Sequence, residues 1–178
     1  MQNLNQYYQS IIQYDLINKF FYNKSFGFSK ISGVILIFLI TFQNIKQLIN
    51  MLCVLELICF QKVKIKLYNK YNSKVKIKKG TIIGCQVNLN LLNKNIFLLN
   101  LIHTNSLITV LLNNYYNKLN YYNLLLKLDL NFFFKNFYSN YFFFKNLPKL
   151  TVNVIIKTNN VFELFFLLQA YKFKIKIK

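Results

Sequence analysis

Lysine alternates with aliphatic residues in short segments, and this alternation constrains the fold more than any other feature of the sequence. The segments are QKVKIKL (61–67), KVKIK (74–78) and the closing YKFKIKIK (171–178). Successive side chains of a β-strand point to opposite faces, so a period of two predicts strands whose lysines share one face. The predicted rows are Lys62, Lys64 and Lys66; Lys74, Lys76 and Lys78; and Lys172, Lys174, Lys176 and Lys178.

The lysine rows suit an anionic partner with regularly spaced charges. Residues on one face of a strand recur about every 6.6 Å, a spacing that matches a run of backbone phosphates. The chain has 23 basic and four acidic residues, a net charge of +19, and so needs neutralisation. Nucleic acid is the simplest partner. Lysine lacks the planar guanidinium of arginine, which can form two parallel hydrogen bonds, so the sequence predicts recognition of shape rather than base sequence. The alternative is a solvated sheet face.

The composition also indicates a gene with strong AT bias, which by itself raises the lysine and phenylalanine content. Every basic residue is lysine, and arginine and tryptophan are absent. An organelle genome is the expected source, and no transit or signal peptide precedes the first expected helix, so synthesis inside the organelle is expected. An odd number of cysteines in apolar surroundings indicates a reducing compartment, and we interpret all three as core residues: Cys53, Cys59 and Cys85.

Hydrophobic spacing predicts a single α+β domain over residues 1–178, with helices packed on one face of a mainly antiparallel sheet. After Pro148, Asn159 or Asn160 is expected to cap a last helix reinforced by Glu163. The region 113–146 is expected to begin as an exposed asparagine-rich loop or arm and to continue in short phenylalanine-rich strands or partner contacts. Other helices are expected over 3–21, 45–59 and 91–112, and strands over 34–40, 61–67, 74–78, 87–89, 150–156 and 171–178.

Membrane and catalytic functions find little support in the sequence. The apolar run GVILIFLITF (33–42) is shorter than the roughly 20 residues of a spanning helix and predicts a strand buried on both faces. His103 has no acid or nucleophile in local register, and Cys53 and Cys59 would point in different directions on a helix. With only four scattered carboxylates, we expect no enzyme, no metal site and no cofactor.

Aromatic residues offer a second mode of nucleic-acid contact, because they can stack on unpaired bases. Burial in the core is the expected role of most phenylalanines, whereas tyrosines beside asparagines suit stacking better. The candidates are Tyr121, Tyr122, Phe132 to Phe134 and Phe142 to Phe144.

The segment KVKIKKGTIIGCQVNL (74–89) resembles the strand, turn and strand of universal large-subunit ribosomal protein five. In that family a basic hairpin arm, here at about 61–80, leads through a Gly-x-x-x-Gly-Cys element into a core strand. Gly80, Gly84 and Cys85 match this structural turn, and Ile82 replaces its usual proline. The resemblance extends to the first helix with its tyrosine pair, to Gln-Lys at 61–62 and to the closing strand, helix and strand.

The resemblance implies a structural constituent of the large ribosomal subunit, located in the central protuberance. The implied partners are large-subunit ribosomal RNA, five-S ribosomal RNA where the ribosome contains one, peptidyl-site tRNA, neighbouring ribosomal proteins and a small-subunit head protein. Ribosomal RNA binding is implied for Lys30, Gln61, Lys62, Lys64 and Lys66. Contact with tRNA through the loop at 67–79 is implied for Lys70, Asn72, Ser73, Lys74, Lys76, Lys78 and Lys79.

Together with the AT bias, the resemblance favours a mitochondrially encoded ribosomal protein, as in ciliates or other protists, in the mitochondrial matrix. KLNYYN (118–123) lacks the family's glycine-rich loop, and the arginines of the arm are replaced by lysine or asparagine, Asn69 among them. Composition alone leaves two other interpretations. One is a generic single-stranded RNA-binding module outside the ribosome, and the other is a small membrane protein in which 33–42 spans lipid.

Overall fold

The computed structural model describes residues 4–22, 27–40, 45–68, 78–103, 108–116, 121–128, 147–173 and 175–177. Its helices are α1 (Leu4–Tyr7), the π-helical turn η1 (Tyr8–Ile12), α2 (Gln13–Lys19), α3 (Ile45–Cys59), α4 (Leu91–His103) and α6 (Val161–Ala170). Its strands are β1 (Lys30–Leu39), β2 (Lys64–Leu67), β3 (Ile82–Asn88), β4 (Ile108–Tyr116), β5 (Tyr121–Leu128), β6 (Leu150–Lys157) and β7 (Ile175–Ile177).

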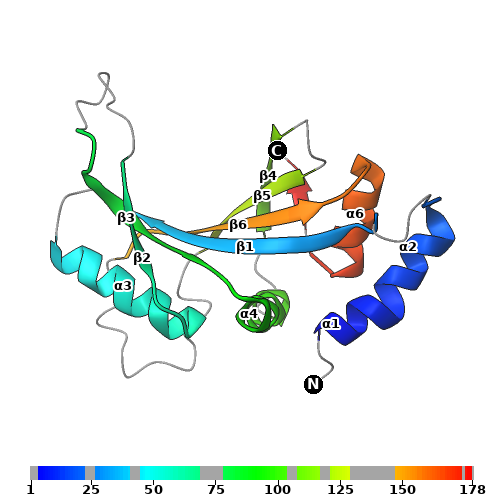
Figure 1. Ribbon diagram of the computed structural model, residues 1–178, viewed down its shortest axis with the longest axis horizontal. Coiled ribbons are helices and arrows are strands. Elements are labelled where there is room, and N and C mark those ends of the chain that lie inside the picture. Colours follow the sequence, from blue (N-terminus) through cyan, green and yellow to red (C-terminus); the bar gives the residue numbers. More distant parts are fainter. Residues whose placement is uncertain are drawn as a thin grey trace.

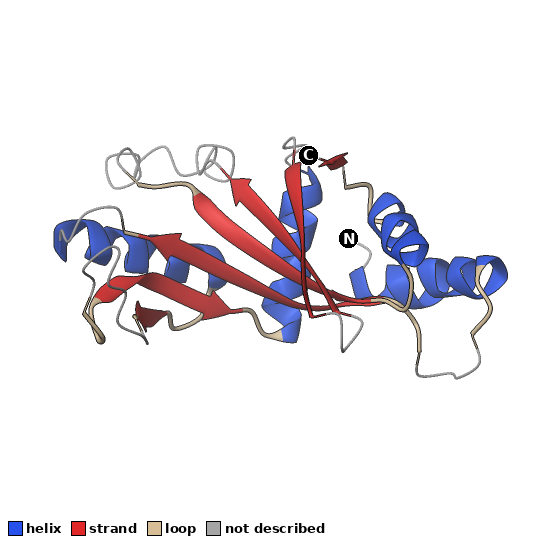
Figure 2. Cartoon of the chain, turned by 90° about the horizontal axis from the view of Figure 1, so that it is seen from above, coloured by secondary structure: helices blue, strands red, loops and turns tan. Residues whose placement is uncertain are grey.

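The described strands form a seven-stranded sheet in the order β2-β3-β1-β6-β5-β4-β7. Neighbouring strands are antiparallel except β4 and β7, which run parallel. The N-terminal helix, α3 and α4 lie on one side of the long central strands (Figure 1). Seen from above, the strands spread as a fan from a point near the middle of the molecule (Figure 2). The prediction of an α+β fold with a mainly antiparallel sheet is confirmed.

Cross-strand rows of apolar side chains build the core on the helix side of the sheet. One row runs through Val87, Leu36, Val152 and Leu126, which are successive register partners on β3, β1, β6 and β5. All four are at most 4% exposed, and they belong to one hydrophobic cluster with buried residues of the helices. Helical members of this cluster include Leu16, Met51, Leu98 and Leu164.

The strand β1 is buried on one face only, which corrects the prediction of burial on both. Val34, Leu36 and Phe38 are buried, whereas Ile35 and Ile37 on the opposite face are partly exposed. The difference follows from the layer arrangement, because the helices named above cover the first face. Among the described residues, no helix combines the length and the apolar character needed to cross a membrane.

Two predictions for the segment after residue 91 are wrong. The helix expected over 91–112 ends at His103, and the chain from Ile108 onward forms β4. The asparagine-rich stretch expected as a loop continues β4, which pairs antiparallel with β5. The β-branched run ITV at the start of β4 favours this strand. The phenylalanine clusters at 132–134 and 142–144 lie outside the described residues.

A buried carboxylate joins the N-terminal end of α6 to the segment before β1. Glu163 is 2% exposed and accepts hydrogen bonds from the Ser29 hydroxyl and, at 3.4 Å, from the backbone N–H of Asn159. The Tyr8 hydroxyl donates to the backbone oxygen of Ser29 at 2.9 Å and brings the first helix into the same network. Asn160 makes no side-chain cap, so the carboxylate rather than an asparagine side chain organises this helix end.

Candidate nucleic-acid interface

The expected basic arm leaves the sheet from β2 and β3, at one edge of the molecule. The two strands pair antiparallel. Beyond them the Tyr68 N–H donates to the oxygen of Thr81, and the Gly80 N–H donates to the oxygen of Tyr68, both at 2.9 Å. The segment that leaves β2 and the segment that enters β3 therefore stay paired up to residues 69–77, which lie outside the described residues.

The turn element at the base of the arm needs glycine for two different reasons. Gly84 has a φ of +157°, and a Cβ atom there would lie 1.9 Å from the backbone oxygen of Phe38 in β1. Gly80 has a φ of +86° with no atom within 4 Å of an added Cβ, so its requirement is conformational. Cys85 is fully buried, and burial raises the pKa of its thiol to about 12. This element thus allows β3 to pack closely on β1.

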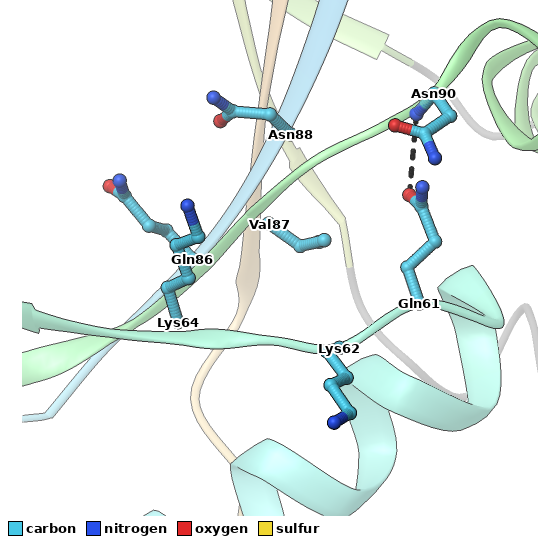
Figure 3. Close-up of a pocket in the computed structure, with 7 residues that line it drawn as sticks. All are labelled: Gln61, Lys62, Lys64, Gln86, Val87, Asn88 and Asn90. Atoms are coloured by element: carbon cyan, nitrogen blue, oxygen red, sulfur yellow. Dashed lines mark hydrogen bonds between the residues drawn. The ribbon is translucent and has the colours of Figure 1, made fainter.

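Because β2 lies at the exposed edge of the sheet, its aliphatic side chains are exposed as well as its lysines. Lys64 is exposed and Lys66 partly exposed, but Ile65 and Leu67 are also 48% and 49% exposed. Lys62 precedes the strand and extends to the opposite side of the chain from Lys64 (Figure 3). The prediction that these lysines share one face is therefore wrong for Lys62, because the period of two holds only within a regular strand.

The chain before β2 diverges from the end of β3 and leaves a hollow of about 520 Å³ between them. The backbone N–H of Asn90 donates to Gln61 Oε1 at 3.3 Å (Figure 3). This hydrogen bond joins the segment before β2 to the segment after β3 at the end of the hollow away from the paired strands. We call this hollow the fork. It is lined by Gln61, Lys62, Lys64, Gln86, Val87, Asn88 and Asn90.

Three polar side chains of the fork lie on one side of the sheet. Lys64 and Gln86 are register partners across β2 and β3, and Asn88 follows two residues later on the same face. Figure 3 shows all three pointing to that side. With respect to the described residues, none of these side chains makes a hydrogen bond or an ion pair. Their ammonium and amide groups are therefore available to a ligand.

The charge of the fork favours an anion. Among the described residues, its lining contains two lysines, four amide side chains and one valine, and no carboxylate. The nearby Glu56 accepts a hydrogen bond from the Val63 N–H at 3.3 Å near the end of α3, and it does not line the hollow. An anionic group at the fork would meet the ammonium of Lys64 on one side of the chain, or that of Lys62 on the other, together with N–H donors of the amides.

The remaining predicted RNA-binding residues are spread over the molecule. Lys30 is exposed at the end of β1 away from the arm, where its register partner is Lys157. Lys78 and Lys79 are exposed at the base of the arm. The other predicted arm residues lie outside the described part of the chain: Lys70, Asn72, Ser73, Lys74 and Lys76.

The C-terminal lysines do not join the fork. Lys172 lies in a turn after α6 with a φ of +58°, so the prediction that it begins a strand row is wrong. The strand β7 begins only at Ile175 and lies at the opposite edge of the sheet from β2. Lys174 and Lys178 lie outside the described residues. The fold therefore separates the first and third lysine rows.

Residues with catalytic or metal-binding chemistry are dispersed in the part of the chain that the structure describes. Within it, no three His, Cys, Asp or Glu side chains gather as a metal site. Cys59 and Cys85 are buried, but Cys53 is exposed, so the interpretation of all three as core residues is wrong for Cys53. The stacking candidates Tyr121 and Tyr122 are partly exposed on β5.

The amide side of the fork was missing from the predicted site. Gln86, Asn88 and Asn90 come from β3 and the turn after it, and the spacing of Gln86 and Asn88 by two was the available signal. Pairing of β3 with β2 brings these residues beside Lys64. A comparison of the chain with protein-family models and with curated proteins found no significant match.

Proposed function

We propose that this protein is a structural constituent of the large ribosomal subunit and binds ribosomal RNA through the fork and the base of the basic arm. The observation that carries the proposal is the fork, where two lysines and four amides line a hollow at the exposed edge of the sheet. Phosphate oxygens accept hydrogen bonds from such groups, and neutralising them releases counterions from RNA.

Two further observations support an RNA partner. The whole chain carries a net charge of +19, and a polyanion relieves the mutual repulsion of its lysines. The exposed Lys78 and Lys79 add cations at the base of the arm, at the other end of the β2–β3 pair from the fork. Lysine holds phosphate as a point charge, which suits a protein that stays in one particle and positions its RNA.

The assignment to a ribosome rests on the resemblance to universal large-subunit ribosomal protein five. The turn element that carries the resemblance has a physical reason, because close packing of β3 on β1 leaves no space for a Cβ at Gly84. The finer parts of the proposal come from the resemblance and the AT-rich composition. They are the location in the central protuberance of a ribosome in the mitochondrial matrix, and contacts with the peptidyl-site tRNA, a five-S RNA and the small-subunit head protein. The proposal includes no enzymatic activity and no cofactor.

Sedimentation of the native protein tests the proposal. Detergent-solubilised mitochondria are separated on sucrose gradients at moderate and at high salt, and each fraction is examined by mass spectrometry. An integral subunit protein will sediment with the large subunit at both salt concentrations. Release at moderate salt, or sedimentation at the top of the gradient, would contradict the proposal and favour a generic RNA-binding module.

A matched pair of variants tests the contribution of the fork to RNA binding. The double change Lys62→Glu with Lys64→Glu should weaken binding to purified large-subunit RNA and reduce the slope of log affinity against log salt by roughly 1.4–1.8, for two lost phosphate contacts. The control, Lys127→Glu with Lys172→Glu, alters net charge equally at exposed positions away from the fork. Equal loss in both variants would show that net charge alone drives binding.

A further inference from the structure

The fork contains groups that phosphate binding alone does not require. Gln86 and Asn88 stand two residues apart on one face of β3, roughly 7 Å from each other. Each side-chain amide presents a donor and an acceptor side by side, whereas a phosphate only accepts. Both amides lack a hydrogen bond to the described residues and point to the side on which Lys64 lies.

The edge of a nucleobase has the complementary chemistry. Each base presents hydrogen-bond donors and acceptors in its plane, and asparagine and glutamine side chains can bind such an edge with two hydrogen bonds. Bases of a regular A-form RNA helix are poorly accessible to side chains in its deep groove, so an unpaired nucleotide is the form that can enter a hollow. A volume of about 520 Å³ lies within the range of small-molecule sites.

Gln61 and Lys64 offer further polar groups for such a site. Gln61 Oε1 already accepts the hydrogen bond from Asn90, which leaves the NH₂ group of Gln61 to donate to a ligand. Val87 lies between the two amides on β3, and its buried side chain points to the opposite face of the sheet. Lys64, the register partner of Gln86, is placed beside the amides to bind the phosphate of the same nucleotide.

We propose that the fork binds a single unpaired nucleotide of RNA, with the base edge on the amides of Gln86 and Asn88 and the phosphate on Lys64. This inference rests on the proposed function and deepens it. It differs from the expectation that lysine rows recognise shape alone, because the amides of β3 add contacts to a base.

The test uses the full-length protein and five small probes: AMP, CMP, GMP, UMP and ribose 5-phosphate, which carries the phosphate without a base. Binding is followed by NMR through the resonances of Gln61, Val87 and Asn90, which all variants retain. At least one nucleotide should bind about tenfold more tightly than ribose 5-phosphate, the factor that one two-point contact to a base supplies.

Two variants separate the base contact from the phosphate contact. Gln86→Met with Asn88→Leu keeps the approximate size of both side chains and removes their amides, so the nucleotides should bind no better than ribose 5-phosphate. Lys64→Met should weaken all five probes, including ribose 5-phosphate, while the advantage of the preferred nucleotide persists.

Equal affinity of the wild-type protein for all five probes would overturn the inference. An unchanged nucleotide advantage in the double variant would overturn it as well. Either result leaves the proposed ribosomal function standing, because sedimentation with the large subunit tests that function independently.

Discussion

At the scale of single residues, Gly84 is a position where the neighbouring backbone leaves no space for a side chain. A Cβ atom there would lie 1.9 Å from the backbone oxygen of Phe38, and neither strand can move without breaking β1–β3 pairing. We expect Gly84→Ala to lower the free energy of unfolding by at least about 2 kcal/mol. Urea denaturation of the purified variant measures this change.

Gly80 supplies the matched control for that substitution. Its added Cβ would meet no atom within 4 Å, so Gly80→Ala should cost only the left-handed backbone conformation, about 1–2 kcal/mol. Gly80→Asn should cost less than Gly80→Ala, because asparagine tolerates that conformation. A smaller loss for Gly84→Ala than for Gly80→Ala would contradict the close packing of β3 on β1.

The three cysteines differ in accessibility, and their chemical reactivity should follow. Cys53 is exposed, whereas Cys59 and Cys85 are buried and burial raises the pKa of both thiols to about 12. At pH 8 an aromatic disulfide reagent should label one thiol of the native protein and three after unfolding. Rapid labelling of more than one thiol in the native protein would be inconsistent with the packing of α3 and β3.

The same two thiols predict a loss of stability in alkali. The pKa of each thiol rises from 9.0 to about 12 on folding. Their contribution to the free energy of unfolding is therefore fully present below pH 9, and it is lost as the pH rises toward 12 because the thiols ionise first in the unfolded state. Lys94 acts in the opposite direction: desolvation and then the charge of Lys30 lower its pKa below 10.5. Stability from Lys94 therefore increases as the pH rises toward 10.5.

We expect the groups with a raised pKa to outweigh Lys94, because the two thiols are joined by Tyr8, whose pKa burial raises to about 12. Urea unfolding between pH 8.5 and 11.5 should give a free energy that falls above pH 9. The fall should be shallower for Cys85→Ala, whatever the stability of that variant at pH 8.5. Identical slopes for wild type and variant would contradict a buried, protonated Cys85.

At the scale of elements, the contact between Ser29 and Glu163 fixes α6 to the start of β1. Both side chains are at most 2% exposed, so removal of either partner leaves a buried polar group unsatisfied. Ser29→Ala and Glu163→Met should each lower the free energy of unfolding by about 1–3 kcal/mol. The double variant should lose less than the sum of the two, by at least about 0.5 kcal/mol.

A substitution on the exposed side of α6 controls for the effect of methionine on the helix. Gln169 is exposed, so Gln169→Met should change the free energy of unfolding by less than about 0.5 kcal/mol. Additive losses in the double variant Ser29→Ala with Glu163→Met would mean that the hydroxyl and the carboxylate act independently.

The elements that the sequence predicts well are those whose pattern is local. Apolar residues at intervals of three and four predict α3 at 45–59, and the alternation of side chains between two faces predicts β6. Both periods are set by residues close together in the sequence. The start of β4 was predicted as helix, since a continuous apolar run is compatible with either structure. Its pairing with β5, the next strand, and with β7, which is distant in sequence, decides the matter.

The candidate site shows the same limit. Lys64 follows from the alternation in β2, but the direction of Lys62 does not, because Lys62 precedes the strand. The amides of Gln86 and Asn88 reach the lysine only through the register of β2 with β3. A hollow that forms where two paired segments diverge leaves no periodic pattern in the sequence of either segment.

At the scale of the whole molecule, a net charge of +19 makes the stability of the free protein depend on salt. Lysine repulsion destabilises the folded chain, and salt screens it, so the melting temperature of the free protein should rise as potassium chloride increases from 0.1 to 0.5 M. Each gain of about 1 kcal/mol would raise the melting temperature by about 2–4 °C for a chain of this size.

RNA should stabilise the protein with the opposite salt dependence. At an RNA concentration 100 times the dissociation constant, binding adds about 2.7 kcal/mol, or roughly 5–10 °C in melting temperature. The same increase in salt weakens RNA binding, so this increment should shrink while the melting temperature of the free protein rises. Calorimetry with and without a large-subunit RNA fragment measures both trends in one salt series. If the two melting temperatures shifted in parallel, RNA would not be neutralising the lysines that repel one another in the free chain.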